Sequence, residues 1–139
     1  MAYDSENIFA KILRGEMPAF TVYENEHCLA FLDVMPQSDG HTLVLPKEPA
    51  ENLYELSDAA AGRLLVTAKT VSAAIHAAFS PDGIRLMQLN GEAAGQTVFH
   101  FHLHIVPCYR QAQARPHGER MAETALLEEH AAKIRAVLN

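Results

Sequence analysis

A histidine occupies every second position in a short apolar run, as His100, His102 and His104. Successive side chains of a β-strand point to opposite faces of a sheet, so a strand here places all three imidazoles on one face. An ordinary hydrophobic core does not require that arrangement. Imidazole can act as a nucleophile, as an acid or base, or as a metal ligand near neutral pH. The run therefore predicts a strand that carries catalytic chemistry or a metal.

The chain has 139 residues, which predicts a single domain (1–139) with one sizeable core. The formal net charge is −6, from 11 basic and 17 acidic residues, and the basic residues are scattered. Nucleic acid is therefore not expected as a partner, because binding its backbone requires clustered positive charge. A single phosphate can be held by neutral N–H groups, so the charge leaves an anionic substrate possible.

The sequence predicts a cytoplasmic protein without a membrane segment. No apolar run approaches the ~20 residues of a membrane-spanning helix, and the polar N-terminus does not resemble a secretion signal. The two cysteines, Cys28 and Cys108, form no motif, which fits a reducing compartment.

Helical and strand-like patterns alternate along the chain. Apolar spacing predicts a short helix over 8–13 capped by Asp4 or Ser5, a long helix from Ser57 to Phe79, and a terminal helix after Arg120. Strands are expected over 20–24, 28–33, 41–45, 84–90 and about 97–108, with a loop over 111–118. Helices outside a run of hairpin-like strands are typical of an α+β fold with an antiparallel sheet.

Several ordered motifs resemble the histidine triad (HIT) family of nucleotide hydrolases and nucleotidyltransferases. The signature lies at residues 95–106 (GQTVFHFHLHIV), and further matches lie at 7–12 and 15–19, at 30–37 and at 40–47. The resemblance spans about 5–110 and leaves 111–139 as a C-terminal loop and helix. It implies a five-stranded antiparallel sheet, with a long helix and a C-terminal helix, that extends across a homodimer.

The resemblance also implies roles for the triad. His102 matches the nucleophile that forms a phosphohistidine, and the backbone carbonyl of His100 would receive its other ring proton. Either flanking histidine could hydrogen-bond the phosphoryl oxygens, and His104 matches the phosphate donor of the family. Gly95, Gln96 and Thr97 resemble the phosphate-contacting loop, with Thr97 near the leaving group.

A nucleotide-binding role is implied for a second group of residues. Asp33 matches the acceptor for both ribose hydroxyls, although a strand-end turn residue is the alternative. Asn90 matches a residue on the phosphate side, or is a turn former. The apolar matches to the base pocket, each equally at home in a core, are Ile8, Phe9, Ile12, Phe31, Leu32 and Val34.

A metal site is the main alternative for the triad, because three alternating histidines can bind zinc. Many bacterial relatives hold a structural zinc with two cysteines and two histidines, at positions corresponding here to Asn7, Ala10, His41 and His100. Asn7 and Ala10 lack the thiolates, so no metal is expected, and His41 is expected to hydrogen-bond within the sheet. The remaining histidines, interpreted as surface or helix-face residues, are His27, His76, His117 and His130.

The function expected from the sequence is cofactor-free cleavage of a purine nucleotide at its α-phosphate, through a nucleotidyl-His102 intermediate. The substrate would be a nucleoside phosphoramidate or a dinucleoside polyphosphate. A histidine at position 104 favours hydrolysis over the uridylyltransferase branch, whose pattern ends in glutamine. The rival interpretation is a nucleotide-binding regulatory or scaffold protein with little turnover. The leaving group and the choice between adenosine and guanosine are not set by the sequence.

Overall fold

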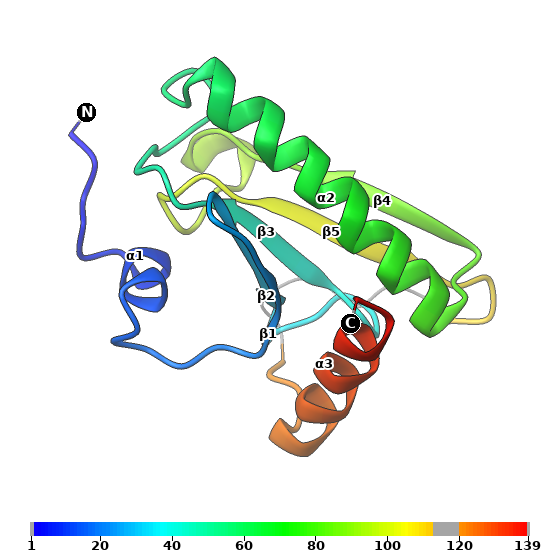
Figure 1. Cartoon of the computed structure of the whole chain (residues 1–139). Helices are drawn as coiled ribbons and strands as arrows, with labels where there is room; N and C mark the ends of the chain where they lie inside the picture. Colours follow the sequence, from blue (N-terminus) through cyan, green and yellow to red (C-terminus); the bar gives the residue numbers. More distant parts are fainter. Residues whose placement is uncertain (1, 113–119, 139) are drawn as a thin grey trace.

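A five-stranded antiparallel sheet forms the centre of the computed structural model, which describes residues 2–112 and 120–138 (Figure 1). The strands are β1 (Thr21–Glu24), β2 (Cys28–Leu32), β3 (Thr42–Pro46), β4 (Gly83–Met87) and β5 (Leu103–Cys108). Their order across the sheet is β1-β2-β3-β5-β4, and every neighbouring pair is antiparallel. The predicted α+β fold is therefore confirmed.

Helices cover the two faces of the sheet unequally. α2 (Asp58–Phe79) and α3 (Thr124–Leu138) bury their apolar side chains against one face, where they form the larger core cluster. α1 (Ile8–Leu13) packs on the opposite face through Phe9 and Ile12, and it lies apart from the other two helices in Figure 1. The only further helical element among the described residues is a 3-10 turn, η1 (Glu92–Ala94). The face beneath α1 is the more thinly covered one.

The alternation of the histidine run sorts its side chains between these two faces, as predicted. Phe101, Leu103 and Ile105 belong to the core cluster under α2. The histidine rings point to the side of α1, where the ring of His102 packs edge-on against Phe9. The apolar side chains of the run thus pack into the core on one face of the sheet, and the imidazoles lie on the opposite face.

α2 forms where its sequence pattern predicts it. Ser57 caps the helix, since its hydroxyl accepts a hydrogen bond from the Ala60 N–H at 3.1 Å. The buried stripe includes the predicted Leu64, Ala68, Val71 and Ile75. Ser80 then adopts a left-handed conformation with φ 48° and ends the helix.

The predicted cap of α1 is wrong, although the helix itself is present. Asn7 is the cap, and its side-chain oxygen accepts a hydrogen bond from the Ala10 N–H at 2.9 Å. Asp4 instead accepts the Glu6 N–H in a turn that precedes the helix. Gly15, with φ 78°, closes the other end, as expected from its freedom in that region.

The predicted boundaries of the last two strands are also wrong. β4 ends at Met87 rather than Asn90, and β5 begins at Leu103 rather than near Thr97. Before Leu103 the backbone leaves the sheet ladder, because the Phe101 N–H donates to the Ala50 carbonyl at 2.8 Å. His100 and His102 therefore precede the regular strand.

The C-terminal region is described only in part. Most of the loop predicted over 111–118, including His117, lies outside the described residues. Of the two interpretations of His130, the surface one is wrong and the helix-face one holds, because His130 is buried on the inward face of α3 with its ring edge-on to Phe79. Among the described residues, no helix is both long and apolar enough to cross a membrane.

Candidate active site

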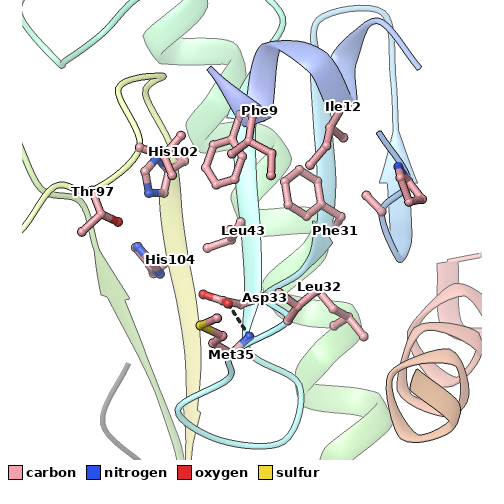
Figure 2. A pocket seen from close by; sticks show the side chains of 15 residues that line it. Phe9, Ile12, Phe31, Leu32, Asp33, Met35, Leu43, Thr97, His102 and His104 are labelled. Carbon is pink, nitrogen blue, oxygen red and sulfur yellow. Dashed lines mark hydrogen bonds between the residues drawn. The ribbon is translucent and has the colours of Figure 1, made fainter. Parts of the chain in front are cut away.

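A cavity of about 340 Å³ opens between α1 and the sheet, beside the histidine run (Figure 2). This volume and a mainly apolar lining with a few polar groups are typical of small-molecule sites. Figure 2 shows Thr97, His102 and His104 on one side of the cavity, across from Phe9 and Phe31. Asp33 lies at the end of the cavity near Met35.

The ring of His102 is held in one orientation by two contacts. Its Nδ1 is 2.7 Å from the backbone carbonyl of His100. A carbonyl can only accept, so Nδ1 carries the proton and Nε2 of the neutral ring carries the lone pair. Phe9 packs edge-on against this ring, with 4.8 Å between the centroids. The contact expected from the family resemblance is present, and it selects the tautomer that a nucleophile needs.

His100 does not line the cavity, unlike the other two triad residues. Its Nε2 donates to the Pro46 carbonyl at 2.8 Å, and its Nδ1 accepts a hydrogen bond from the Tyr3 hydroxyl at 2.5 Å. Both ring nitrogens are therefore used inside the protein. The side chain is fully buried, and this burial lowers the pKa of His100 from 6.5 to about 4.

This lowered pKa predicts a loss of stability in mild acid. The unfolded chain binds a proton at His100 below about pH 6.5, whereas the folded chain does so only near pH 4. The contribution is therefore complete above pH 6.5 and disappears as the pH falls to 4, at a cost of roughly 3 kcal/mol. Urea unfolding of the wild type and of His100→Gln, between pH 7 and 4, measures it. Parallel stability curves for the two proteins would contradict the assignment.

His41 forms a hydrogen bond within the sheet, as expected, and it thereby joins the triad through a chain whose members the sequence did not predict. The Gln37 N–H donates to Nδ1 of His41 at 3.0 Å, so the proton of the neutral His41 ring lies on Nε2. That Nε2 is 2.9 Å from Nδ1 of His104, which must accept. His104 therefore carries its own proton on Nε2. The chain turns His104 into a hydrogen-bond donor at a cavity-lining position.

Asp33 is brought to the same polar cluster from the end of β2. One carboxylate oxygen accepts the Met35 N–H at 2.8 Å, shown dashed in Figure 2. The other lies 3.5 Å from Nε2 of His41. The carboxylate lines the cavity while only 7% of the residue is exposed, so the turn role and the ligand-facing position coexist.

The loop before the triad divides into a cavity-facing residue and supporting ones. Thr97 lines the cavity, and Gly95 adopts φ 103°, a conformation that favours glycine. The Gln96 amide accepts the Gly91 N–H and donates to the carbonyls of Glu51 and Val98. These three bonds make Gln96 a support for the loop rather than a lining residue.

Asn90 also lies away from the cavity lining. Its side-chain oxygen accepts the Leu53 N–H at 2.8 Å, and its amide pairs with the Gln88 side chain. These contacts fix the end of the segment after β4. The phosphate-side position implied by the resemblance is not visible in this arrangement.

All six apolar residues matched to a base pocket line the cavity, namely Ile8, Phe9, Ile12, Phe31, Leu32 and Val34. Sequence matching missed Pro18, Ala19, Met35, Leu43 and Val98, which also line it. No sequence signal distinguished Pro18, Ala19, Met35 and Val98 from ordinary core or loop residues. Alternation along β2 and β3 could have suggested Leu43, because its neighbour His41 points to the same face.

A metal ion requires several ligand atoms close together, and two groups of residues bear on this requirement. Asp33, His41 and His104 place one ligand atom each within 4.8 Å of one another, which sequence spacing did not reveal. The four-ligand structural zinc of the relatives does not fit, because Asn7 is used as a helix cap and Ala10 offers no ligand atom. Both ring nitrogens of His100 are engaged as well.

Known proteins resemble this chain in sequence and in fold. The HIT domain family matches residues 14–111. Protein hit of Bacillus subtilis is 47% identical over 102 residues, which cover 73% of this chain and 70% of that protein. A Hit-like protein of Bartonella henselae superposes with a TM-score of 0.91 at 41% identity, over 98% of this chain and 99% of the other. A hypothetical histidine triad nucleotide-binding protein of Sulfolobus tokodaii gives a TM-score of 0.86 at 34% identity, over 94% of this chain and 90% of the other.

Proposed function

Because this chain belongs to the HIT domain family, we propose that it binds a purine nucleotide and hydrolyses it at the α-phosphate. The reaction passes through a nucleotidyl-histidine intermediate on His102. Its substrates are nucleoside phosphoramidates or dinucleoside polyphosphates. The observation that carries this proposal is the bond from His102 Nδ1 to the His100 carbonyl, which leaves the lone pair on Nε2 at a cavity-lining position.

The chemistry divides into two displacements at phosphorus. In the first, Nε2 of His102 forms a bond to the α-phosphorus, and the bond from phosphorus to the leaving group breaks with its electron pair. The imidazolium that results is stabilised by its Nδ1–H bond to the His100 carbonyl. In the second, a water oxygen bonds to phosphorus, the Nε2–P bond breaks with its electron pair returning to Nε2, and a nucleoside monophosphate leaves. The proton that the water loses balances the one that the leaving group takes up.

His104 supplies the donor that this reaction requires. The chain from Gln37 through His41 puts the His104 proton on Nε2. A fixed donor aimed at a phosphoryl oxygen gains strength as negative charge develops there. Thr97, on the same side of the cavity in Figure 2, is placed beside the leaving group in this proposal.

The apolar part of the cavity accommodates the nucleoside. Aromatic and aliphatic side chains from α1 and β2 can hold a flat base by packing, and Asp33 can accept the ribose hydroxyls. The name of the Sulfolobus neighbour, a hypothetical histidine triad nucleotide-binding protein, agrees with a nucleotide as the ligand. In this proposal Asn90 and Gln96 act only by holding the loop near the phosphate.

Turnover across a panel of compounds tests the proposed function. Adenosine and guanosine phosphoramidates, dinucleoside polyphosphates and nucleotide sugars should be compared, and release of nucleoside monophosphate from the first two classes is expected. The Bartonella neighbour is described as involved in cell-cycle regulation, which favours the rival role of a regulatory nucleotide binder. Saturable binding of nucleoside monophosphate without turnover of any compound would support that rival.

A homodimer is the proposed assembly. β4 lies at one edge of the sheet, and its Leu86 is 48% exposed. α2 presents Leu65 and Val66, which are 60% and 66% exposed. Open strand edges and exposed apolar side chains favour pairing with a second copy.

We expect sedimentation equilibrium to give twice the mass of one chain, and the double variant Leu65→Glu, Val66→Glu to shift it toward the monomer. Val137→Glu places one such charge at an exposed apolar position of α3 and serves as the control. A monomeric wild type would rule the assembly out.

A further inference from the structure

The N-terminal arm that precedes α1 reaches the first histidine of the triad. The Tyr3 hydroxyl lies 2.5 Å from Nδ1 of His100, and the two rings pack edge-on with 5.6 Å between centroids. We propose that Tyr3 is a positioning residue for His102, acting through His100. The proposal rests on the proposed role of His102, but it also makes a claim about ring geometry that can be tested without turnover.

The direction of each hydrogen bond follows from its partners. The Pro46 carbonyl only accepts, so Nε2 of His100 must carry the proton that it receives. Nδ1 then has the lone pair, and the Tyr3 hydroxyl must donate to it. Tyr3 thus satisfies the second nitrogen of a ring that is fully buried. Without the hydroxyl, that nitrogen would be left buried and unpaired, which is costly.

The backbone around His100 depends on such side-chain contacts. β5 begins only at Leu103, so the residues before it are not held by strand pairing on both sides. They are held by the Phe101 N–H bond to Ala50 and by the two bonds of the His100 ring. The His100 carbonyl lies in this stretch and receives the Nδ1 proton of His102. If the His100 ring loses one of its hydrogen bonds, the His100 carbonyl that accepts the His102 proton is therefore held less firmly.

The same arm also supports the opposite side of the His102 ring. Asp4, next to Tyr3, offers its carbonyl to the backbone and side chain of Asn7, the cap of α1. α1 carries Phe9, which packs edge-on against His102. Tyr3 thus ties the arm to His100 at the point where the arm leads into the helix that covers the site.

Replacing Tyr3 with phenylalanine tests the proposal, because it removes the hydroxyl and keeps the ring. We expect kcat on the best phosphoramidate substrate to fall about five- to tenfold, the effect of one buried hydrogen bond. The Kd for nucleoside monophosphate should stay within about twofold, since Tyr3 does not line the cavity. In nitrogen-15 NMR, His102 should change from a single Nδ1–H tautomer to a mixture.

Tyr109→Phe is the matched control. The Tyr109 hydroxyl also donates a hydrogen bond, to the Asp39 carbonyl at 2.7 Å, and Tyr109 does not line the cavity. This variant should retain wild-type kcat and the wild-type His102 spectrum. Equal losses in both variants would assign the effect to general stability and overturn the proposal.

The NMR measurement separates the two proposals if the wild type shows no turnover. In that case the proposed hydrolase function fails, while a changed His102 tautomer in Tyr3→Phe would still establish the positioning role. An unchanged His102 spectrum in Tyr3→Phe would overturn the positioning role, whether or not the protein is an active hydrolase. A loss of kcat together with an unchanged spectrum would have the same consequence.

Discussion

Replacing His102 with alanine is expected to lower turnover by at least about 10³-fold while the nucleotide still binds. The variant removes the nitrogen that we propose forms the bond to phosphorus, and it leaves the apolar side of the cavity in place. Steady-state kinetics on a phosphoramidate and the Kd for nucleoside monophosphate measure the two effects separately. His76→Ala, which removes an exposed histidine of α2, is the control and should match the wild type.

The covalent intermediate gives this prediction a direct chemical readout. Rapid quenching of the wild type at saturating substrate should trap an acid-labile, base-stable nucleotide label, and peptide mapping should place it on His102. His104→Ala and His100→Ala should cost less than His102→Ala, since neither residue forms the bond to phosphorus in the proposed mechanism. In His100→Ala the backbone carbonyl that orients His102 remains, but the imidazole ring whose hydrogen bonds hold that carbonyl in place is gone. Full activity of His102→Ala, with no trapped label, would require direct attack by water or a pure binding role.

Replacing Asp33 with alanine should weaken the binding of ribonucleoside monophosphates by roughly 1.5 to 3 kcal/mol, the range for hydrogen bonds to a charged group. This corresponds to a roughly 10- to 150-fold increase in Kd. The carboxylate lines the cavity at the end of β2, where it can accept both ribose hydroxyls. Binding of 2′,3′-dideoxynucleotides should be almost unchanged, because these ligands offer no such donors.

The dideoxy comparison is needed because Asp33 also has a structural contact. Its carboxylate accepts the Met35 N–H, and alanine would lose that bond for every ligand. Asp39→Ala removes an exposed carboxylate from the same loop, outside the cavity lining, and should leave both affinities unchanged. Equal losses for ribo- and dideoxynucleotides in Asp33→Ala would mean that Asp33 acts on the fold rather than on the ribose.

The triad is asymmetric in a way that its sequence does not express. His102 and His104 line the cavity, whereas the His100 ring is buried and bonded on both nitrogens. The alternating spacing left open a phosphate contact from the His100 side chain. In this arrangement both of its ring nitrogens are already bonded within the protein, so the side chain does not provide that contact. The three alternating positions thus hold a ring bonded inside the protein, followed by two cavity-lining rings, which are the proposed nucleophile and the proposed donor.

The sequence by itself determined the fold class, the family and the face on which the histidines lie. These properties depend on local patterns, namely apolar alternation in β5, helical spacing in α2, and motifs whose residues are neighbours in the chain. Six of the apolar residues that line the cavity were also named from the sequence, because they lie in matched segments. What each histidine contacts was not predictable in this way.

Only the tertiary structure decided the partners that set the tautomers. Tyr3 and His100 are 97 positions apart, His41 and His104 are 63 apart, and the Pro46 carbonyl is 54 positions from His100. The Pro46 carbonyl is a backbone group, as are the His100 carbonyl that faces His102 and the Gln37 N–H that faces His41, and backbone groups carry no sequence signal. A ring nitrogen holds or lacks its proton according to the group that faces it, and folding alone brings that group into place.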